Sequence, residues 1–159
     1  MGISGGDKML SALQAIAEKT QISLSAGILA GATNEDMGEL IAPYAAANEY
    51  GTKTIPPRPF MRTSIDNHAK DWSQQLAKSL DGIGADPGVV KKGFDRLGLT
   101  IVQDIRDSIE SSIPPANAKS TIDAKIRKGR KEPDKTLIDS GSMQRAVDYE
   151  INGGDDGSV

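Results

Sequence analysis

The side chains that could carry out acid–base or metal chemistry are few in this sequence. The 159 residues include one histidine, His68, and no cysteine. Nucleophilic catalysis needs a base within hydrogen-bonding reach of the nucleophile, whereas His68 lies early in a segment that reads as an exposed helix. A transition-metal site would have to be rich in carboxylates, and no acidic cluster has suitable ligand spacing. We therefore expect no enzymatic activity, no catalytic residue, no metal site and no cofactor.

Glycine-rich stretches near both ends of the sequence are weak candidates for ion or phosphate sites. Residues 153–157 read GGDDG and faintly resemble a calcium-binding turn, but such turns bind as stacked repeats and this is a single copy. The glycines before Asp7 and Lys8 lack the spacing of a phosphate loop, and no strand precedes them. We expect residues 153–159 to form a flexible polar tail.

A basic segment between residues 119 and 135 is the strongest candidate for contact with nucleic acid. It holds seven lysines and arginines against three acidic residues, and such a run can contact phosphates. No aromatic residue is interleaved for base stacking, and the whole chain carries a formal charge of −3. The alternative is a solvated loop or a rim that pairs with an acidic partner surface. The central basic residues are Lys125, Arg127, Lys128, Arg130 and Lys131.

Length and composition predict one soluble domain over residues 1–159. Six aromatic residues in the whole chain mean that aliphatic side chains must fill most of the core. The start of the sequence has neither a basic cluster nor an apolar run, so we do not expect it to be a signal peptide. No stretch approaches the roughly 20 apolar residues that span a bilayer, and we expect no membrane partner.

Apolar periodicity predicts the elements that must position any site. Spacings of three and four indicate helices, which we expect at residues 7–17, 40–50, 65–80 and 86–109, with Gly51 ending the second and Asp86-Pro87 beginning the fourth. Alternation indicates strands, which we expect at residues 22–30 and 147–151. Gly98 interrupts the apolar stripe of the fourth helix, so we expect another backbone to approach there. Asp139 is expected to cap a short helix through Arg145.

Two proline-rich stretches break this pattern. Three prolines within residues 56–59 forbid a regular helix and favour extended backbone, so residues 52–62 are expected to form a stiff extended connector. Residues 113–136 begin with Ile113-Pro114-Pro115, lack periodicity and are expected to form a long irregular loop. The fold class is therefore α+β, a small, mostly antiparallel sheet packed by two or three longer helices. Because a two-stranded sheet is marginal in water, we expect further strands or a sheet completed by a neighbouring subunit.

Two stretches resemble a known protein family. Residues 41–62 read IAPYAAANEYGTKTIPPRPFMR: an Ala-rich helix, an Asn-Glu-aromatic-Gly-Thr turn and a Pro-Arg-Pro-Phe segment. Residues 136–151 read TLIDSGSMQRAVDYEI: a Leu-Ile-Asp-Ser-Gly turn, a short helix and a closing strand. Both are similar to the neck and tail-completion (head–tail joining) proteins of tailed bacteriophages, as are Ser120, Thr121, Ile122 and Lys125 ahead of the second.

The resemblance implies a structural virion protein of a phage or prophage, a head–tail connector or tail-terminator type subunit. Such subunits form a homo-oligomeric ring, here of six or twelve copies, assembled in the host cytoplasm and crossed by DNA. Its neighbours would be other neck, portal-adaptor and tail-tube proteins. We also expect an intersubunit or structural corner in which Arg58 pairs with Glu49 or Asp139 and Phe60 is a buried anchor. Its residues are Glu49, Tyr50, Gly51, Thr52, Pro57, Arg58, Pro59 and Phe60.

Overall fold

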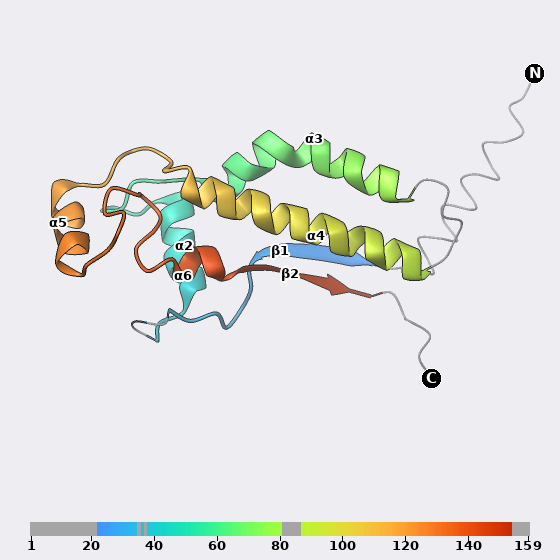
Figure 1. Cartoon of the computed structure of the whole chain (residues 1–159), viewed down its shortest axis with the longest axis horizontal. Helices are drawn as coiled ribbons and strands as arrows, with labels where there is room; N and C mark the ends of the chain where they lie inside the picture. The colour runs from blue at the N-terminus through green and yellow to red at the C-terminus, as the bar shows by residue number, and fades with distance from the viewer. Residues whose placement is uncertain (1–21, 35, 37, 81–86, 154–159) are drawn as a thin grey trace, which may run out of the picture.

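The computed structural model describes residues 22–34, 36, 38–80 and 87–153. The helix expected at residues 7–17, the Asp86 cap and the tail from residue 154 lie outside the described residues. Within them the chain runs through two strands and five helices (Figure 1): β1 (Ser23–Ile28), α2 (Ile41–Tyr50), α3 (Phe60–Leu80), α4 (Pro87–Glu110), α5 (Lys119–Arg127), α6 (Ser142–Arg145) and β2 (Val147–Asn152).

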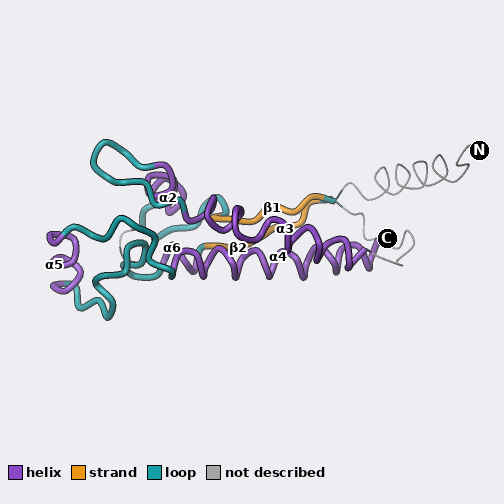
Figure 2. The backbone as a smooth tube through the Cα atoms, turned by 90° about the horizontal axis from the view of Figure 1, so that it is seen from above, coloured by secondary structure: helices purple, strands orange, loops and turns teal. Residues whose placement is uncertain are grey.

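The long helix α4 is the axis of the molecule. Helix α3 packs along one side of it and the two strands pack along the other (Figure 1). The apolar stripe predicted for this helix is confirmed, because Val90, Leu97, Ile105 and Ile109 are all buried. Helix α3 and both strands run roughly along α4, so the protein is elongated, with α5 at one end (Figures 1 and 2).

The sheet consists of β1 and β2 paired antiparallel, with Ser23 opposite Asn152 and Ile28 opposite Val147. The predicted α+β class is confirmed. Strand β1 lies within the residues predicted for it, and β2 extends one residue past the predicted end, to Asn152. The described residues contain no third strand, although Thr33 and Leu40 form an isolated bridge. Each strand therefore has one edge without a strand partner in the described chain.

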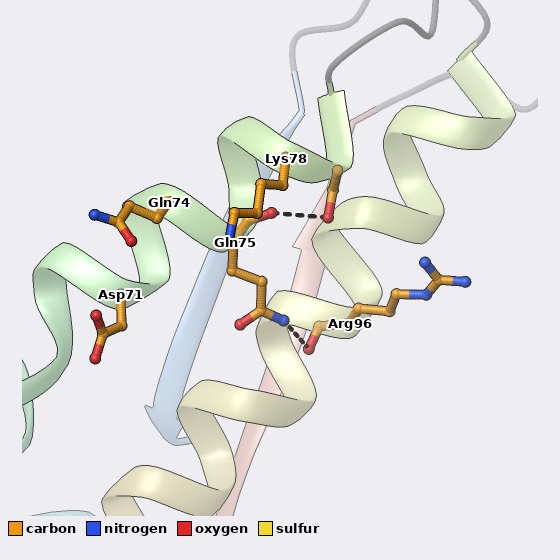
Figure 3. Close-up of a pocket in the computed structure, with 6 residues that line it drawn as sticks. Asp71, Gln74, Gln75, Lys78 and Arg96 are labelled. Carbon is orange, nitrogen blue, oxygen red and sulfur yellow. Dashed lines mark hydrogen bonds between the residues drawn. The ribbon is translucent and has the colours of Figure 1, made fainter.

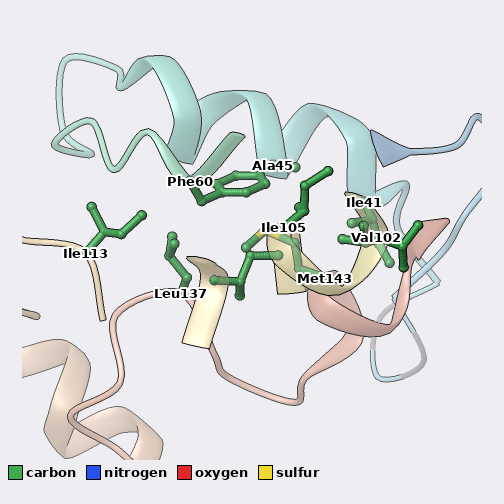
Figure 4. Packing of buried hydrophobic residues seen from close by; sticks show 10 residues of the cluster. Ile41, Ala45, Phe60, Val102, Ile105, Ile113, Leu137 and Met143 are labelled. Carbon is green, nitrogen blue, oxygen red and sulfur yellow. The ribbon is translucent and has the colours of Figure 1, made fainter. Parts of the chain in front are cut away.

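The main hydrophobic core lies where α2, α6 and the start of α3 meet α4 (Figure 4). Ile41 and Ala45 of α2 and Phe60 of α3 contribute from one side, and α4 contributes from the other. The residues that follow α5 close the core. They are Leu137, Met143 and Val147, and all three are buried.

Three predictions of local structure were wrong. The loop expected at residues 113–136 contains helix α5, and the connector expected to be extended through Arg62 becomes helical at Phe60. The short helix α6 begins at Ser142, after Gly141 in a left-handed conformation, and Asp139 does not cap it. On α3, the predicted apolar face is only partly covered, since Ile65 is exposed and Trp72 is half-buried.

Gly98 allows close approach of a side chain, not of the backbone that we expected. The ring of Tyr149 from β2 lies directly on the Gly98 backbone, and a Cβ at this position would overlap three atoms of the ring. Tyr149 also donates a hydrogen bond of 3.1 Å from its hydroxyl to Asp95 Oδ1. This contact ties the sheet to the middle of α4.

The close contact predicts that Gly98→Ala destabilises the fold by about 1–3 kcal/mol, because Tyr149 must leave its position. Urea denaturation followed by circular dichroism would measure the change. In a Tyr149→Ala background the same substitution is expected to be neutral or stabilising, because alanine favours helix over glycine. Equal destabilisation in both backgrounds would contradict the assignment of the clash to the tyrosine ring.

Candidate functional site

The candidate site is the corner formed by residues 48–62, where the chain passes from α2 to α3. Helix α2 ends at Gly51, which has a φ of 78°. A Cβ at Gly51 would lie 2.9 Å from Pro57 Cδ. Glycine is therefore required here both by backbone conformation and by the close approach of the proline segment.

Thr52 organises the turn that follows. Its hydroxyl oxygen accepts hydrogen bonds from the backbone N–H groups of Thr54 (3.2 Å) and Ile55 (3.0 Å). The backbone N–H of Thr52 donates to the Ile55 carbonyl at 2.8 Å. These contacts fold the chain back on itself and bring the proline segment against α2.

The carboxylate of Glu49 caps the start of α3. Its oxygens accept hydrogen bonds from the backbone N–H groups of Met61 (2.9 Å) and Arg62 (3.2 Å). Pro59 precedes the helix and has no side-chain acceptor, so Glu49 does what an N-cap side chain ordinarily does. The negative charge also faces the positive end of the helix dipole.

Arg62 completes this junction. Its Nε donates to Glu49 Oε1 at 2.8 Å and its Nη2 donates to the Glu49 carbonyl at 2.7 Å. The guanidinium carbon of Arg62 lies 5.2 Å from the centre of the Tyr50 ring. Tyr50 itself is 71% exposed, which leaves its ring open to contact from another molecule.

Arg58 does not pair with Glu49 or Asp139, so that prediction was wrong. It is buried, and its side chain donates from Nε to the Pro115 carbonyl (2.9 Å) and from Nη2 to the Ala116 carbonyl (3.3 Å). Its backbone N–H donates to the Asn48 carbonyl at 2.6 Å. Arg58 thus fastens the second proline turn to the corner.

Phe60 is a buried anchor, as predicted. It belongs to the main core, and its carbonyl accepts a hydrogen bond of 2.8 Å from the hydroxyl of Ser108 on α4. Pro57 and Pro59 restrict the backbone between the Thr52 turn and this anchor. The structure therefore brings the predicted corner residues together within one subunit.

The basic segment is more ordered and less free than a solvated loop. Helix α5 forms its first half, and Lys125 on that helix is buried. The Lys125 ammonium donates to the carbonyls of Lys135 (2.5 Å) and Ile138 (2.6 Å). Burial lowers the pKa of Lys125, and Asp139 partly offsets that effect. Lys125 therefore stabilises the turn after α5.

Asp139 pairs with two more of these cations. It accepts from Lys128 Nζ at 3.3 Å and from Arg130 Nη2 at 3.2 Å, and Arg130 also bonds Asp36 at 2.5 Å. Burial acts to raise the pKa of Asp139, but the hydrogen bonds from Arg130 and Lys128 outweigh it and hold that pKa below its usual value. Within the described chain, Arg127 and Lys131 are the central basic residues that make no hydrogen bond or ion pair.

A cleft of about 550 Å³ separates the corner from α5. One wall comes from α2 and the proline segment, including Tyr44, Ile55 and Arg58. The other wall comes from α5 and the turn after it, including Lys125 and Asp139. Sequence reasoning did not identify the cleft, because its walls are distant in sequence and α5 was not predicted.

A second groove of about 550 Å³ runs between α3 and α4 (Figure 3). Its lining is polar, and Gln75 bridges the helices by donating to the Arg96 carbonyl at 3.4 Å.

His68 is half-buried beside Trp72, and its Nδ1 lies 4.0 Å from Asp104 Oδ2. The described residues contain no group of three potential metal ligands. No helix among them is long and apolar enough to cross a membrane.

The capping role predicts that Glu49→Ala destabilises the protein by about 2–3 kcal/mol, because it leaves two N–H groups of α3 without their buried charged acceptor. The matched variant Arg62→Ala removes the other half of the ion pair, but its side chain is 54% exposed, so its loss should cost about 1 kcal/mol or less. Urea denaturation of both variants measures the difference. Equal costs would show that the ion pair, and not the cap, is what Glu49 contributes.

The depressed pKa of Asp139 predicts an acid-sensitive contribution to stability. The carboxylate stabilises the folded state above its unfolded pKa of about 3.9, and this contribution is lost as pH falls through the lower folded value. The difference in unfolding free energy between wild type and Asp139→Asn should therefore shrink between roughly pH 5 and pH 2. Denaturation across this range would measure it. A difference that stays constant with pH would contradict the prediction.

Comparison with known proteins identifies no relative of this chain. The chain matches no protein-family model, and searches of curated proteins and of solved structures return no match.

Proposed function

We propose that the chain is a structural virion protein of a tailed bacteriophage or prophage. In this proposal it is a neck or tail-completion subunit that forms a ring at the head–tail junction, through which DNA passes. It acts in the virion after assembly in the host cytoplasm, without enzymatic activity. Its partners are further copies of itself and the neighbouring neck, portal-adaptor and tail-tube proteins.

The observation that carries the proposal is the packing of the two family-like stretches against each other. Ile41, Ala45 and Phe60 come from the first stretch, and Leu137, Met143 and Val147 come from the second. All six belong to one core cluster although the stretches are separated by more than seventy residues (Figure 4). A resemblance confined to two stretches carries more weight when both build the same structural unit.

The surface supports assembly with other copies. Both strands of the sheet have an edge without a strand partner in the described chain, and such an edge is a template for pairing with another chain. Large apolar side chains are also exposed, among them Tyr50, Ile65 and Leu99. A ring needs two different complementary surfaces whose repeated rotation closes, and an elongated subunit with contacts along its length can supply them.

The alternative of a nucleic-acid-binding module draws less support from the geometry. Lys125, Lys128 and Arg130 are held by carbonyls or carboxylates. Arg127 and Lys131 remain for phosphate contacts, and two cations give weak, non-specific, salt-sensitive binding. That level of contact is compatible with DNA passing through a ring channel.

The test is the mass of the purified protein by light scattering over a concentration series, with negative-stain images of large species. The proposal predicts a closed ring of six or twelve copies at high concentration, and Tyr50→Ser should weaken assembly because it removes an exposed aromatic contact. Lys131→Ser, at an exposed charge, is the matched control. A strict monomer under all conditions would count against a self-assembling ring, and tight sequence-specific DNA binding would favour the alternative.

A further inference from the structure

The cleft between the corner and α5 contains two cations that the fold has buried without pairing them. Arg58 and Lys125 line opposite walls, and each is only 6% exposed. No carboxylate among the described residues lies within ion-pair distance of either one. A buried charge without a counter-ion is costly, so the absence of a partner within the subunit calls for an explanation.

The internal hydrogen bonds of these cations leave donors unused. The Arg58 guanidinium carries five N–H donors, and within the described chain it gives two bonds, to the Pro115 and Ala116 carbonyls. The Lys125 ammonium carries three N–H donors and gives two bonds, to the Lys135 and Ile138 carbonyls. Backbone carbonyls satisfy hydrogen bonds but supply no net negative charge.

Asp139 is the acidic residue with the largest effect on the pKa of Lys125, but its carboxylate is hydrogen-bonded to other cations. Asp139 raises the pKa of Lys125, but burial, the larger effect, lowers it, and the charge of Arg58 lowers it further. The Asp139 carboxylate accepts hydrogen bonds from Lys128 and Arg130 at the rim. Asp36 and Glu39 also line the cleft, but neither lies within ion-pair distance of Arg58 or Lys125. These two buried cations therefore lack a direct counter-ion among the described residues.

The cleft also contains a hydroxyl that could bind an anion and apolar side chains that could contact the rest of a ligand. The Thr136 hydroxyl lines the cleft and is buried, and no hydrogen-bond partner for it is present among the described residues. Leu40 and Tyr44 line the same cleft as exposed side chains, next to Ile55 and Pro56. A volume near 550 Å³ suits a small organic ligand or a few side chains.

We infer that this cleft is a binding site for a carboxylate carried on an apolar body. The carboxylate would lie between Arg58 and Lys125 and accept their remaining N–H groups and the Thr136 hydroxyl. The apolar body would cover Leu40, Tyr44 and Pro56. A free small molecule and a Glu or Asp side chain of a neighbouring protein share this chemistry. The site does not depend on ring formation, since every residue in it belongs to one subunit.

The test is an NMR titration of the full-length protein with benzoate and, separately, with its neutral analogue benzamide. Benzoate should perturb signals of Arg58, Lys125 and Thr136 and raise the pKa of the Lys125 ammonium, because a bound anion favours the charged form. Benzamide should bind at least tenfold more weakly. Equal binding of the two probes, or no binding of benzoate, would overturn the inference.

Variants separate the site from general electrostatic attraction. Lys125→Met should weaken benzoate binding about tenfold or more, whereas Arg127→Met, which removes an exposed cation from the same helix, should leave it unchanged. Thr136→Val is a milder test if Lys125→Met proves unfolded by circular dichroism, and it should also weaken binding. Equal effects of the Lys125 and Arg127 variants would overturn the inference.

A peptide arm identifies the source of the carboxylate. Tighter binding of acetyl-Leu-Glu-Leu-amide than of benzoate, with loss on changing Glu to Gln, supports a side chain of a neighbouring protein. Tighter binding of benzoate supports a small molecule. Both outcomes support the site, and they are independent of the ring measurement, which concerns the oligomeric state alone.

Discussion

The Glu49 carboxylate at the start of α3 is the interaction on which the corner depends. A helix that follows Pro59 has no local side chain to accept its first N–H groups, and Glu49 supplies that acceptor from the end of α2. Because the carboxylate is only 5% exposed, it fixes α2 and α3 in one relative orientation. In that orientation Phe60 packs against α4. Residues of the C-terminal segment then pack around it to complete the core.

At the same end of the molecule, two buried cationic side chains stabilise turns of the backbone. Arg58 holds the turn at Pro115 and Ala116, and Lys125 holds the turn between Lys135 and Ile138. Both cations bond to carbonyls that no helix or strand would otherwise satisfy. A segment that looks like a basic surface in the sequence therefore serves largely as a framework. As a result, two buried cations without a direct counter-ion line the cleft.

The opposite half of the molecule is built differently. There α4 carries the sheet on one side and α3 on the other, and side-chain contacts such as Tyr149 on Gly98 and Trp72 with Asp104 (2.6 Å) hold the layers together. A two-stranded sheet is marginal alone, and here its stability comes from α4. Its outer edges keep their pairing capacity. The molecule thus combines a locked corner at one end with a surface suited to association along its length.

The sequence by itself determined the α+β class, the long helix α4, both strands and the end of α2 at Gly51, because these depend on local periodicity and on the backbone freedom of glycine. It also identified the corner residues and the buried position of Phe60. Only the tertiary structure decided where α3 begins, because its cap comes from Glu49 across the proline turn. Likewise, α5 has no side-chain cap of its own and is held by contacts of Lys125 with a later turn. The pairing of Arg58 and the cleft beside it depend on residues more than fifty positions apart, and spacing along the chain carries no information about such contacts.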